Sequence, residues 1–317
     1  MGKGFIGARQ TTLNSEIVLN GIGVHSGAPA SIILHPADVD TGIRFHIVKG
    51  SRIAAEIVAD HKSVSNVTLC TVLSDGNGAS VATVEHLLAA IRGLSIDNIV
   101  IEIDSGEVPI MDGSSVQFVE AIDETGIRLL DSPRRFVKIL ETIRIKDGKS
   151  IGELRPYSGF QIDVEIDFDT PVIGHQRYIV DVNPGVFRSE LARARTFGFM
   201  DDVERLWAAG RALGASLENT VAIGKDRIIN PEGLRFADEF VRHKALDAIG
   251  DLALAGAPII GAFRSVRGGH WMNSKVLSAL FANKDAWTLV EAPRVRDTGH
   301  VDLGYGVAVA NYAADRS

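Results

Sequence analysis

The stretch FVRHKALDAIGDLALAGAPIIGAF, residues 240–263, is a long apolar run that also contains His243, Lys244, Asp247 and Asp251. The uncharged remainder is too short to span a membrane and contains a glycine and a proline, so we expect a buried helix of a soluble protein. On a helix, His243 and Asp247 share one face, and Asp251 follows one turn later. These buried polar groups need partners, which a structural hydrogen-bond network or half of a metal site would supply.

Composition narrows the class of protein. The chain has 317 residues, 45% of them hydrophobic and 23% charged, which is typical of a globular protein large enough for two domains. A net charge of -7 argues against a protein whose main task is to bind nucleic acid. Cys70 is the single cysteine, which excludes an intrachain disulfide framework and a cysteine-based zinc finger. Because residues 1–21 contain no export signal, we expect a cytoplasmic protein.

The first part of the chain predicts mostly short strands, since Ile, Val and Leu clusters alternate with turn residues. Strands are expected at residues 15–24, 30–36, 42–48, 67–73 and 98–103. Between the last two strands, a helix is predicted to begin near Thr83, as N-cap, and to end at Gly93. A second helix is expected at residues 114–126.

The best candidate for a linker is the segment 129–139, because Asp131, Ser132 and Pro133 interrupt both the helix and the strand pattern. Beyond it the pattern repeats, with strands expected at 136–145, 151–155 and 160–168 and helices at 186–192, 201–209 and in the long apolar run. We therefore expect two α+β domains, at residues 1–130 and 136–285, followed by a C-terminal extension at 286–317.

The sequence lacks the motifs of several common enzyme classes. The tetrapeptide DGKS at 147–150 resembles the end of a phosphate loop, but Ile143 stands where its first glycine should be. The sequence also lacks a G-x-G-x-x-G that opens a helix after a strand, an H-E-x-x-H and a G-x-S-x-G. Nucleotide hydrolysis, dinucleotide redox chemistry and α/β-hydrolase chemistry are therefore disfavoured.

The fragment TVEHLLAA, residues 83–90, places Glu85 beside His86. On a helix these side chains point about 100° apart, so one could bind a metal while the other reaches a metal-bound water. Alternatively, Glu85 stabilises the first turn of the helix and His86 is an ordinary half-buried histidine. Taken alone, the fragment favours the second interpretation.

A third fragment, RSVRGGHWMN at 264–273, places His270 after two glycines and before a predicted helix. Glycines permit close approach of the backbone, and an imidazole can transfer protons near neutral pH. A surface histidine that caps a helix would have the same pattern.

Together these fragments resemble one family. In chain order, the motifs TVEHLLAA, IMDGSS, RARTFGFM, FVRHKALDAIGDL and GGH are similar to those of the zinc-dependent UDP-3-O-acyl-N-acetylglucosamine deacetylases of lipid A biosynthesis. The resemblance extends from GIGVHSG near the N-terminus to about residue 285. It implies two similar α+β domains, each a sheet with helices on one face, packed with the helices inward and the active site between them. It also implies a protein without stable membrane insertion, and we expect a monomer.

The resemblance implies a metal site made of His86, His243 and Asp247. Three such ligands leave a fourth position for water, which is the pattern of a catalytic rather than a structural zinc. Ferrous iron can also occupy a site with two histidines and one aspartate.

The resemblance further assigns Glu85 as the general base that activates water. The hydroxyl group of Thr196 would help to stabilise the oxyanion. His270 matches a cationic histidine that stabilises the oxyanion and could protonate the leaving amine, although Glu85 could shuttle the proton both ways. Asp251 would orient His270 and favour its protonated form.

Substrate contacts are also implied by the resemblance. Lys244 matches a substrate-binding position beside the metal, and Arg267 a basic position near the diphosphate. Phe168 could stack on uracil, or could simply be the inward residue of a strand. His25 matches a family position close to the site.

Residues 197–224 match a βαβ insertion that forms a passage for the acyl chain. The candidates to line this passage are Phe197, Leu206, Trp207 and Leu213, although such a stripe is more often plain core. Two rival functions stay open: a metal-dependent deacetylase of another amidosugar, and a non-catalytic binder of lipid intermediates. The complete catalytic set argues against the second.

Overall fold

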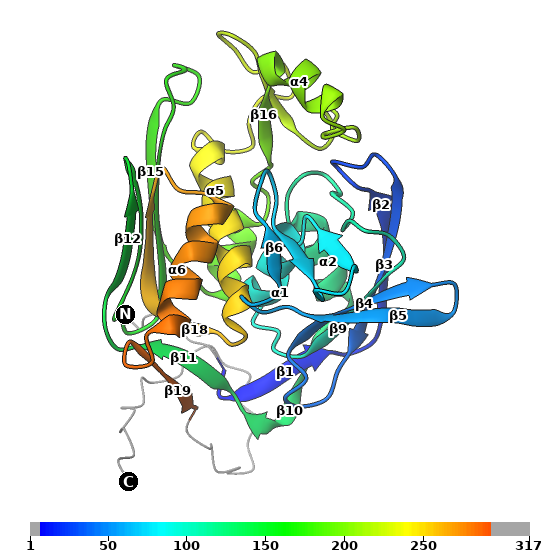
Figure 1. The fold of residues 1–317 in the computed structure, drawn as a ribbon, viewed down its shortest axis with the longest axis vertical. Helices are drawn as coiled ribbons and strands as arrows, with labels where there is room; N and C mark the ends of the chain where they lie inside the picture. Colours follow the sequence, from blue (N-terminus) through cyan, green and yellow to red (C-terminus); the bar gives the residue numbers. More distant parts are fainter. Residues whose placement is uncertain (1–6, 293–317) are drawn as a thin grey trace.

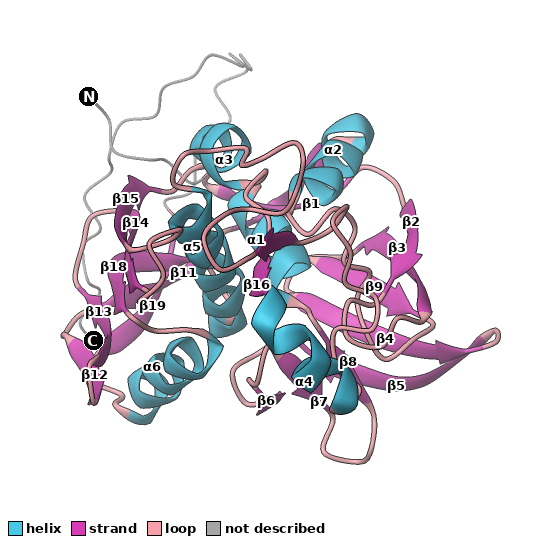
Figure 2. Cartoon of the chain, turned by 90° about the horizontal axis from the view of Figure 1, so that it is seen from above, coloured by secondary structure: helices cyan, strands magenta, loops and turns pink. Residues whose placement is uncertain are grey.

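The computed structural model of the chain describes residues 7–292 and contains two large β-sheets with helices between them (Figure 1). The view from above shows helices α1 (Glu85–Gly93) and α5 (Glu239–Leu252) in the space between the sheets (Figure 2). Helix α1 contacts α5, and α5 in turn packs on strand β14 (Phe160–Asp167) of the second sheet. The prediction of an α+β fold is confirmed.

The first sheet is formed by residues 17–103, and its central strand, β9 (Ile99–Ile103), is parallel to its neighbour β4 (Ile43–Lys49). Its strand order is β2 (Ile17–Ile22), β3 (Pro29–Pro36), β9 (Ile99–Ile103), β4 (Ile43–Lys49) and β5 (Arg52–Val58). Buried residues alternate with partly exposed ones along β9, as expected for a strand with one face in the core. Two helices follow its strands, α1 (Glu85–Gly93) and α2 (Val116–Thr125).

Two smaller sheets accompany the first one. One contains β6 (Val64–Asn66), β7 (Val72–Ser74) and β8 (Ser80–Ala82), and the other pairs β1 (Arg9–Leu13) with β10 (Ile127–Pro133). Part of the strand expected at 67–73 is therefore a loop, because Leu69 adopts a left-handed conformation with a φ of 70°. The strand β7 begins only at Val72.

The second sheet is larger and is formed by the second half of the chain. Its order is β12 (Ile143–Asp147), β13 (Ser150–Arg155), β18 (Ile259–Val266), β11 (Arg135–Ile139) and β19 (Trp287–Glu291), and β18 also pairs with β14 (Phe160–Asp167), which pairs with β15 (His175–Asp181). The helical segments that go with it are α3 (Pro184–Val186), a π-helical turn (Phe187–Leu191), α5 (Glu239–Leu252), a 3-10 turn (Ala253–Ala255) and α6 (His270–Ala282).

A glycine allows the two central helices to meet. A Cβ atom added at Gly250 of α5 would lie 2.0 Å from the carbonyl oxygen of Glu85 at the start of α1. Such a contact is impossible without a backbone shift, so the close crossing requires a residue without a side chain at this position. The crossing brings the polar end of α1 against the polar face of α5.

Two local predictions were wrong. Thr83 is not the N-cap of α1, because Val84 precedes the helix and the Thr83 hydroxyl donates instead to Glu107, with a φ of 59° at Thr83. Residues 129–139 are not a linker, since they lie in β10 and β11. The residues that suggested a break are at the end of β10, which among the described residues pairs with β1 alone, and an edge strand tolerates proline.

Residues 197–224 contain β16 (Phe197–Phe199), a 3-10 turn (Met200–Asp202), α4 (Val203–Ala208) and β17 (Val221–Ile223). Strands β16 and β17 are parallel, as in a βαβ unit. In the expected C-terminal extension, residues 287–291 form strand β19, which pairs with β11, whereas residues 293–317 lie outside the described part of the chain.

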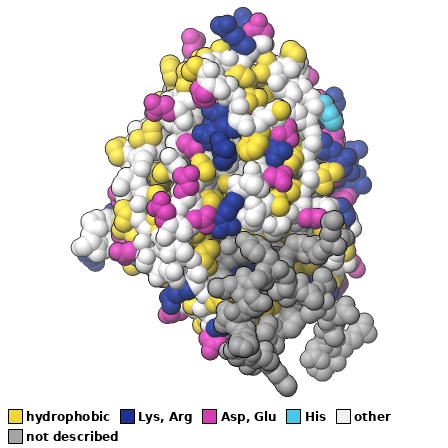
Figure 3. All heavy atoms as spheres, turned by 180° about the vertical axis from the view of Figure 1, so that it is seen from behind, with side chains coloured by type: hydrophobic (Ala, Val, Ile, Leu, Met, Phe, Trp, Pro, Cys, Tyr) yellow, Lys and Arg dark blue, Asp and Glu magenta, His cyan; other side chains and the backbone are white. Residues whose placement is uncertain are grey.

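No helix within residues 7–292 is long and apolar enough to cross a membrane. On the face opposite to the view of Figure 1, acidic and basic side chains are interspersed (Figure 3). The charges of this face therefore do not gather into a surface of one sign.

Candidate active site

Three potential metal ligands converge where α1 meets α5. His86 comes from α1, and His243 and Asp247 from one face of α5, as their four-residue spacing predicts. Asp247 Oδ1 lies 3.5 Å from His86 Nε2 and 3.3 Å from His243 Nε2. One ligand atom from each residue lies within 4.8 Å of the others, and all three side chains are buried.

The hydrogen bonds around these ligands leave the converging atoms free. His243 Nδ1–H donates to the carbonyl oxygen of Ala194 at 3.0 Å, which directs Nε2 toward Asp247. Asp247 Oδ2 accepts from Lys244 Nζ at 2.7 Å, whereas the buried Oδ1 has no hydrogen-bond partner among the described residues. A buried carboxylate oxygen without a donor, between two imidazole nitrogens, fits a divalent cation.

The electrostatic environment favours the protonation states that a metal needs. Burial lowers the pKa of His243 to about 3, so its imidazole is neutral. Burial alone would favour the neutral acid at Asp247, but the Lys244 ammonium, which donates a hydrogen bond to Oδ2, holds the pKa of this carboxyl group well below its ordinary value. Neutral imidazoles and an ionised carboxylate are the ligand forms of metal-binding His and Asp.

Glu85 lies beside the ligands with its carboxylate at the cavity. Its Oε2 accepts the Thr71 backbone N–H at 3.1 Å, and its Oε1 is 3.7 Å from His270 Nε2. Burial raises the pKa of Glu85, although His270 and His86 favour its charged form. A carboxylate whose pKa is raised above its ordinary value is a stronger base, which suits it to accept a proton from water.

Asp251 and His270 form a second pair next to Glu85. His270 Nδ1–H donates to Asp251 Oδ2 at 2.8 Å, and Asn273 Nδ2 donates to the same oxygen at 2.8 Å. Burial opposes a charged imidazole, but the carboxylates of Asp251 and Glu85 outweigh it and raise the pKa of His270 to about 9. His270 is therefore a cation at neutral pH.

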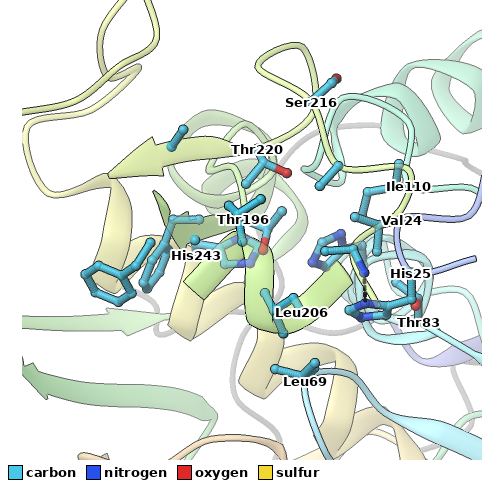
Figure 4. Close-up of a pocket in the computed structure, with 18 of the residues that line it drawn as sticks. Val24, His25, Leu69, Thr83, Ile110, Thr196, Leu206, Ser216, Thr220 and His243 are labelled. Atoms are coloured by element: carbon cyan, nitrogen blue, oxygen red, sulfur yellow. Dashed lines mark hydrogen bonds between the residues drawn. The ribbon is translucent and has the colours of Figure 1, made fainter. Parts of the chain in front are cut away.

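Most of these groups line a cavity of about 490 Å³, and Figure 4 shows His243 and Thr196 in its wall. The part of the wall that we call the polar end is formed by Glu85, the three potential ligands, Thr196, Lys244 and His270. Most of the remaining wall is apolar, and the insertion 197–224 contributes Phe197, Phe199, Met200, Val203, Leu206, Trp207, Ala212, Ala215 and Leu217. The arrangement suits a molecule with a hydrolysable polar group at one end and a long apolar group at the other.

Comparison with known proteins agrees with this arrangement. Residues 10–282 match the sequence profile of the UDP-3-O-acyl N-acetylglycosamine deacetylase family. The chain belongs to this family of deacetylases. It is also 53% identical to proteins named UDP-3-O-acyl-N-acetylglucosamine deacetylase from Brucella ovis, Brucella canis and Brucella suis, over 286 residues that cover 90% of this chain and 99% of each relative.

Other residues that the sequence suggested line the same cavity of this deacetylase. Thr196 lines the cavity, and its backbone N–H donates to the Gly113 carbonyl oxygen at 2.8 Å. His25 lies in the loop after β2 and contacts the insertion, since its Nδ1 accepts the Ala212 N–H at 3.4 Å. Burial lowers the pKa of His25.

Three predicted substrate contacts are not among the described residues that line the cavity. Phe168 packs against Phe197 and Phe199, with ring centroids 5.9 Å from each. Arg267 forms an ion pair with Asp167 at the end of β14. Leu213 is 53% exposed and contacts the loop after β2, where its N–H donates to the His25 carbonyl oxygen.

Sequence reasoning missed several residues that hold the site of the deacetylase together. Arg195, which precedes Thr196, is 1% exposed and is bonded through its N–H and its Nε to Glu239, the first residue of α5. Thr71 and Asn273 donate to Asp251. The available signal for Arg195 was a charged residue directly before the candidate Thr196, whereas no feature of the sequence pointed to Thr71.

Proposed function

We propose that this deacetylase hydrolyses the N-acetyl group of UDP-3-O-acyl-N-acetylglucosamine in the cytoplasm, releasing acetate and the free amine as the committed step of lipid A biosynthesis. The observation that carries the proposal is the convergence of His86, His243 and Asp247 with Glu85 and His270 at the polar end of an apolar cavity. The family membership supports the same substrate.

His86, His243 and Asp247 would hold the metal, and we propose zinc because two imidazoles and one carboxylate suit it. When bound, zinc would polarise the acetamide carbonyl and increase the acidity of a neighbouring water molecule. Ferrous iron remains an alternative occupant of the same ligand set.

Glu85 acts as general base in this proposal. Its carboxylate is buried beside the ligands and is oriented by the Thr71 N–H, so it can take a proton from the attacking water. The departing amine can then be protonated either by Glu85, which returns this proton, or by His270, which gives its own Nε2 proton and recovers one from Glu85, whose Oε1 is 3.7 Å away.

His270 and Thr196 act on the developing negative charge. The cationic imidazole of His270 faces the cavity while Asp251 holds its other nitrogen, so the charge is preorganised before the reaction begins. The Thr196 hydroxyl can donate a hydrogen bond to the oxyanion from the cavity wall. Neither group has to reorient greatly during the reaction.

The apolar wall would receive the acyl chain. Phe197 and Leu206 line the cavity, and Lys244 lies near its polar end, where its Nζ is 5.6 Å from the Phe197 ring centroid. We propose that Lys244 and His25 contact the sugar part of the substrate. Stacking of Phe168 on uracil and a contact of Arg267 with the diphosphate remain predictions.

The test is acetate release from UDP-3-O-acyl-N-acetylglucosamine by the purified protein. We expect activity that chelation abolishes and that one equivalent of zinc restores, with ferrous iron added in parallel. Glu85→Ala should remove the activity while retaining the metal. If the folded, metal-loaded protein releases no acetate from this compound but releases it from another amidosugar, the proposed substrate is wrong. The proposed reaction, metal-dependent hydrolysis of an acetamide, would still hold.

A further inference from the structure

Thr71 connects the two halves of the active site. It lies in the loop between β6 and β7, two positions after Leu69, which has a left-handed backbone conformation. Leu69 lines the cavity, whereas Thr71 is 2% exposed. The Thr71 N–H donates to Glu85 Oε2 at 3.1 Å, and its hydroxyl group donates to Asp251 Oδ1 at 2.6 Å. Glu85 belongs to α1, whereas Asp251 belongs to α5, 180 positions after Thr71.

We infer that Thr71 is a positioning residue, which holds the Asp251–His270 pair in register with Glu85; this inference rests on the proposed function. Thr71 is not among the residues that line the cavity, so it acts through the two carboxylates and not on the substrate. Among the described residues, its hydroxyl group is the hydrogen-bond donor to Asp251 Oδ1.

The hydrogen bonds on Asp251 explain why this donor matters. Oδ2 accepts from both His270 and Asn273, so Thr71 on Oδ1 completes the restraint of the carboxylate plane. Asn273 leaves its own amide oxygen buried without a partner in the described chain. That loss is compensated because its amide donates to a carboxylate, a stronger bond than one between neutral groups.

The consequence for His270 is geometric. With Nδ1–H committed to Asp251, the other ring nitrogen faces Glu85 Oε1 at 3.7 Å. If Oδ1 lost its donor, a buried lone pair would be left unsatisfied and the carboxylate could rotate away from the imidazole. His270 would then be both less well oriented and less readily protonated.

Thr71→Val tests this role, because valine has nearly the same shape as threonine and keeps the backbone N–H that binds Glu85. We expect kcat to fall about tenfold with KM little changed, since a hydrogen bond to a buried charged group is lost. The alkaline limb of the pH–rate profile should move to lower pH. Thr71→Ser, which retains the hydroxyl group, should stay within about twofold of the wild type.

Thr68→Val is the matched control in the same loop. Thr68 is exposed, and within residues 7–292 its one hydrogen bond is from its backbone N–H to the Asn66 side chain, so the kinetics and pH profile of this variant should not change. Metal content and melting temperature should be measured for every variant. An active wild type with an unaffected Thr71→Val variant would overturn the inference, whereas an inactive wild type would overturn the proposed function instead.

A double-mutant cycle separates positioning from general stability. If Thr71 acts through Asp251, Thr71→Val should cost little further activity in an Asp251→Asn background. An equal additional loss in both backgrounds would contradict the inference. Titration of the His270 ring by NMR in metal-free protein gives a second readout that does not depend on turnover: its pKa should fall in Thr71→Val and stay unchanged in Thr71→Ser.

Discussion

The two ends of the cavity are built in opposite ways. At the polar end, Glu85 and Asp247 are each 3% exposed and lie on helices that form the centre of the core. At the apolar end, Trp207 is 55% exposed and belongs to a short unit, β16 to β17, outside the two large sheets. The side chains of the polar end are therefore held by the packing of the fold, whereas the surface proposed for the acyl chain can change without disturbing that packing.

The largest loss of activity is expected when one of the potential metal ligands is removed from the polar end of the cavity. We expect Asp247→Ala to lose the metal and all measurable acetate release, because its Oδ1 is the atom shared by both imidazoles. Chelation of the wild type should lower its melting temperature, since a metal at 100 times its Kd adds about 2.7 kcal/mol of stability. Metal analysis and thermal unfolding measure both effects.

The control for Asp247 is Asp238→Ala. Asp238 precedes α5 and pairs with Arg242, whose guanidinium group lies over the Tyr178 ring, and Asp238 is not among the residues that line the cavity, so this variant should keep the metal and most of the activity. Equal metal content in Asp247→Ala and the wild type would show that the three converging residues do not form the metal site.

The next largest effect should come from the general base. Glu85→Gln keeps the side-chain shape and an oxygen that can accept the Thr71 N–H, but it cannot take a proton from water. We expect kcat to fall by about 10²- to 10⁴-fold with metal content unchanged. A variant that binds metal and retains more than a tenth of the wild-type kcat would remove Glu85 from the base role.

Much of the polar end could be predicted from the sequence because its residues repeat at helical spacing. His243, Asp247 and Asp251 lie one turn apart on α5, and their shared face is buried as expected. The contact of that face with His86 could not be derived from spacing, since it depends on how α1 crosses α5 at Gly250. The resemblance to a known family supplied it.

Local signals failed where long-range contacts decide the structure. Thr83 has the residue type of an N-cap, but its hydroxyl group binds Glu107, 24 positions later. Asp131 to Pro133 resemble a linker, yet pairing with β1 from the start of the chain turns them into a strand. Thr71 could not be recognised because its partner Asp251 is 180 positions away.

The pH dependence of kcat tests whether the charged form of His270 is required at the polar end. The pKa of His270 is raised from 6.5 to about 9, so the stabilisation from its charge is fully present below 6.5 and is lost as the pH rises through about 9. We expect kcat to fall about tenfold per pH unit above that value if the cation is required. Pre-steady-state or steady-state rates between pH 7 and 10.5, at constant metal loading, measure this limb.

Asp251→Asn is the partner variant for this titration. Removing the carboxylate beside His270 should move the alkaline limb to lower pH, because Asp251 is the main group that favours the charged imidazole. A limb that stays in place in this variant would assign it to a group other than His270.

The smallest effect is expected at the apolar end, where Leu206→Ala tests the wall. Leu206 is half-buried and lines the cavity, so its truncation should lower kcat/KM for the long-acyl substrate by about tenfold at most. A short-acyl analogue should be unaffected, since it would not reach the wall. Leu213→Ala is the matched control, because Leu213 lies in the same insertion but does not line the cavity. Equal losses for both variants, or a loss independent of acyl length, would mean that the insertion affects the fold of the site and not the binding of the chain.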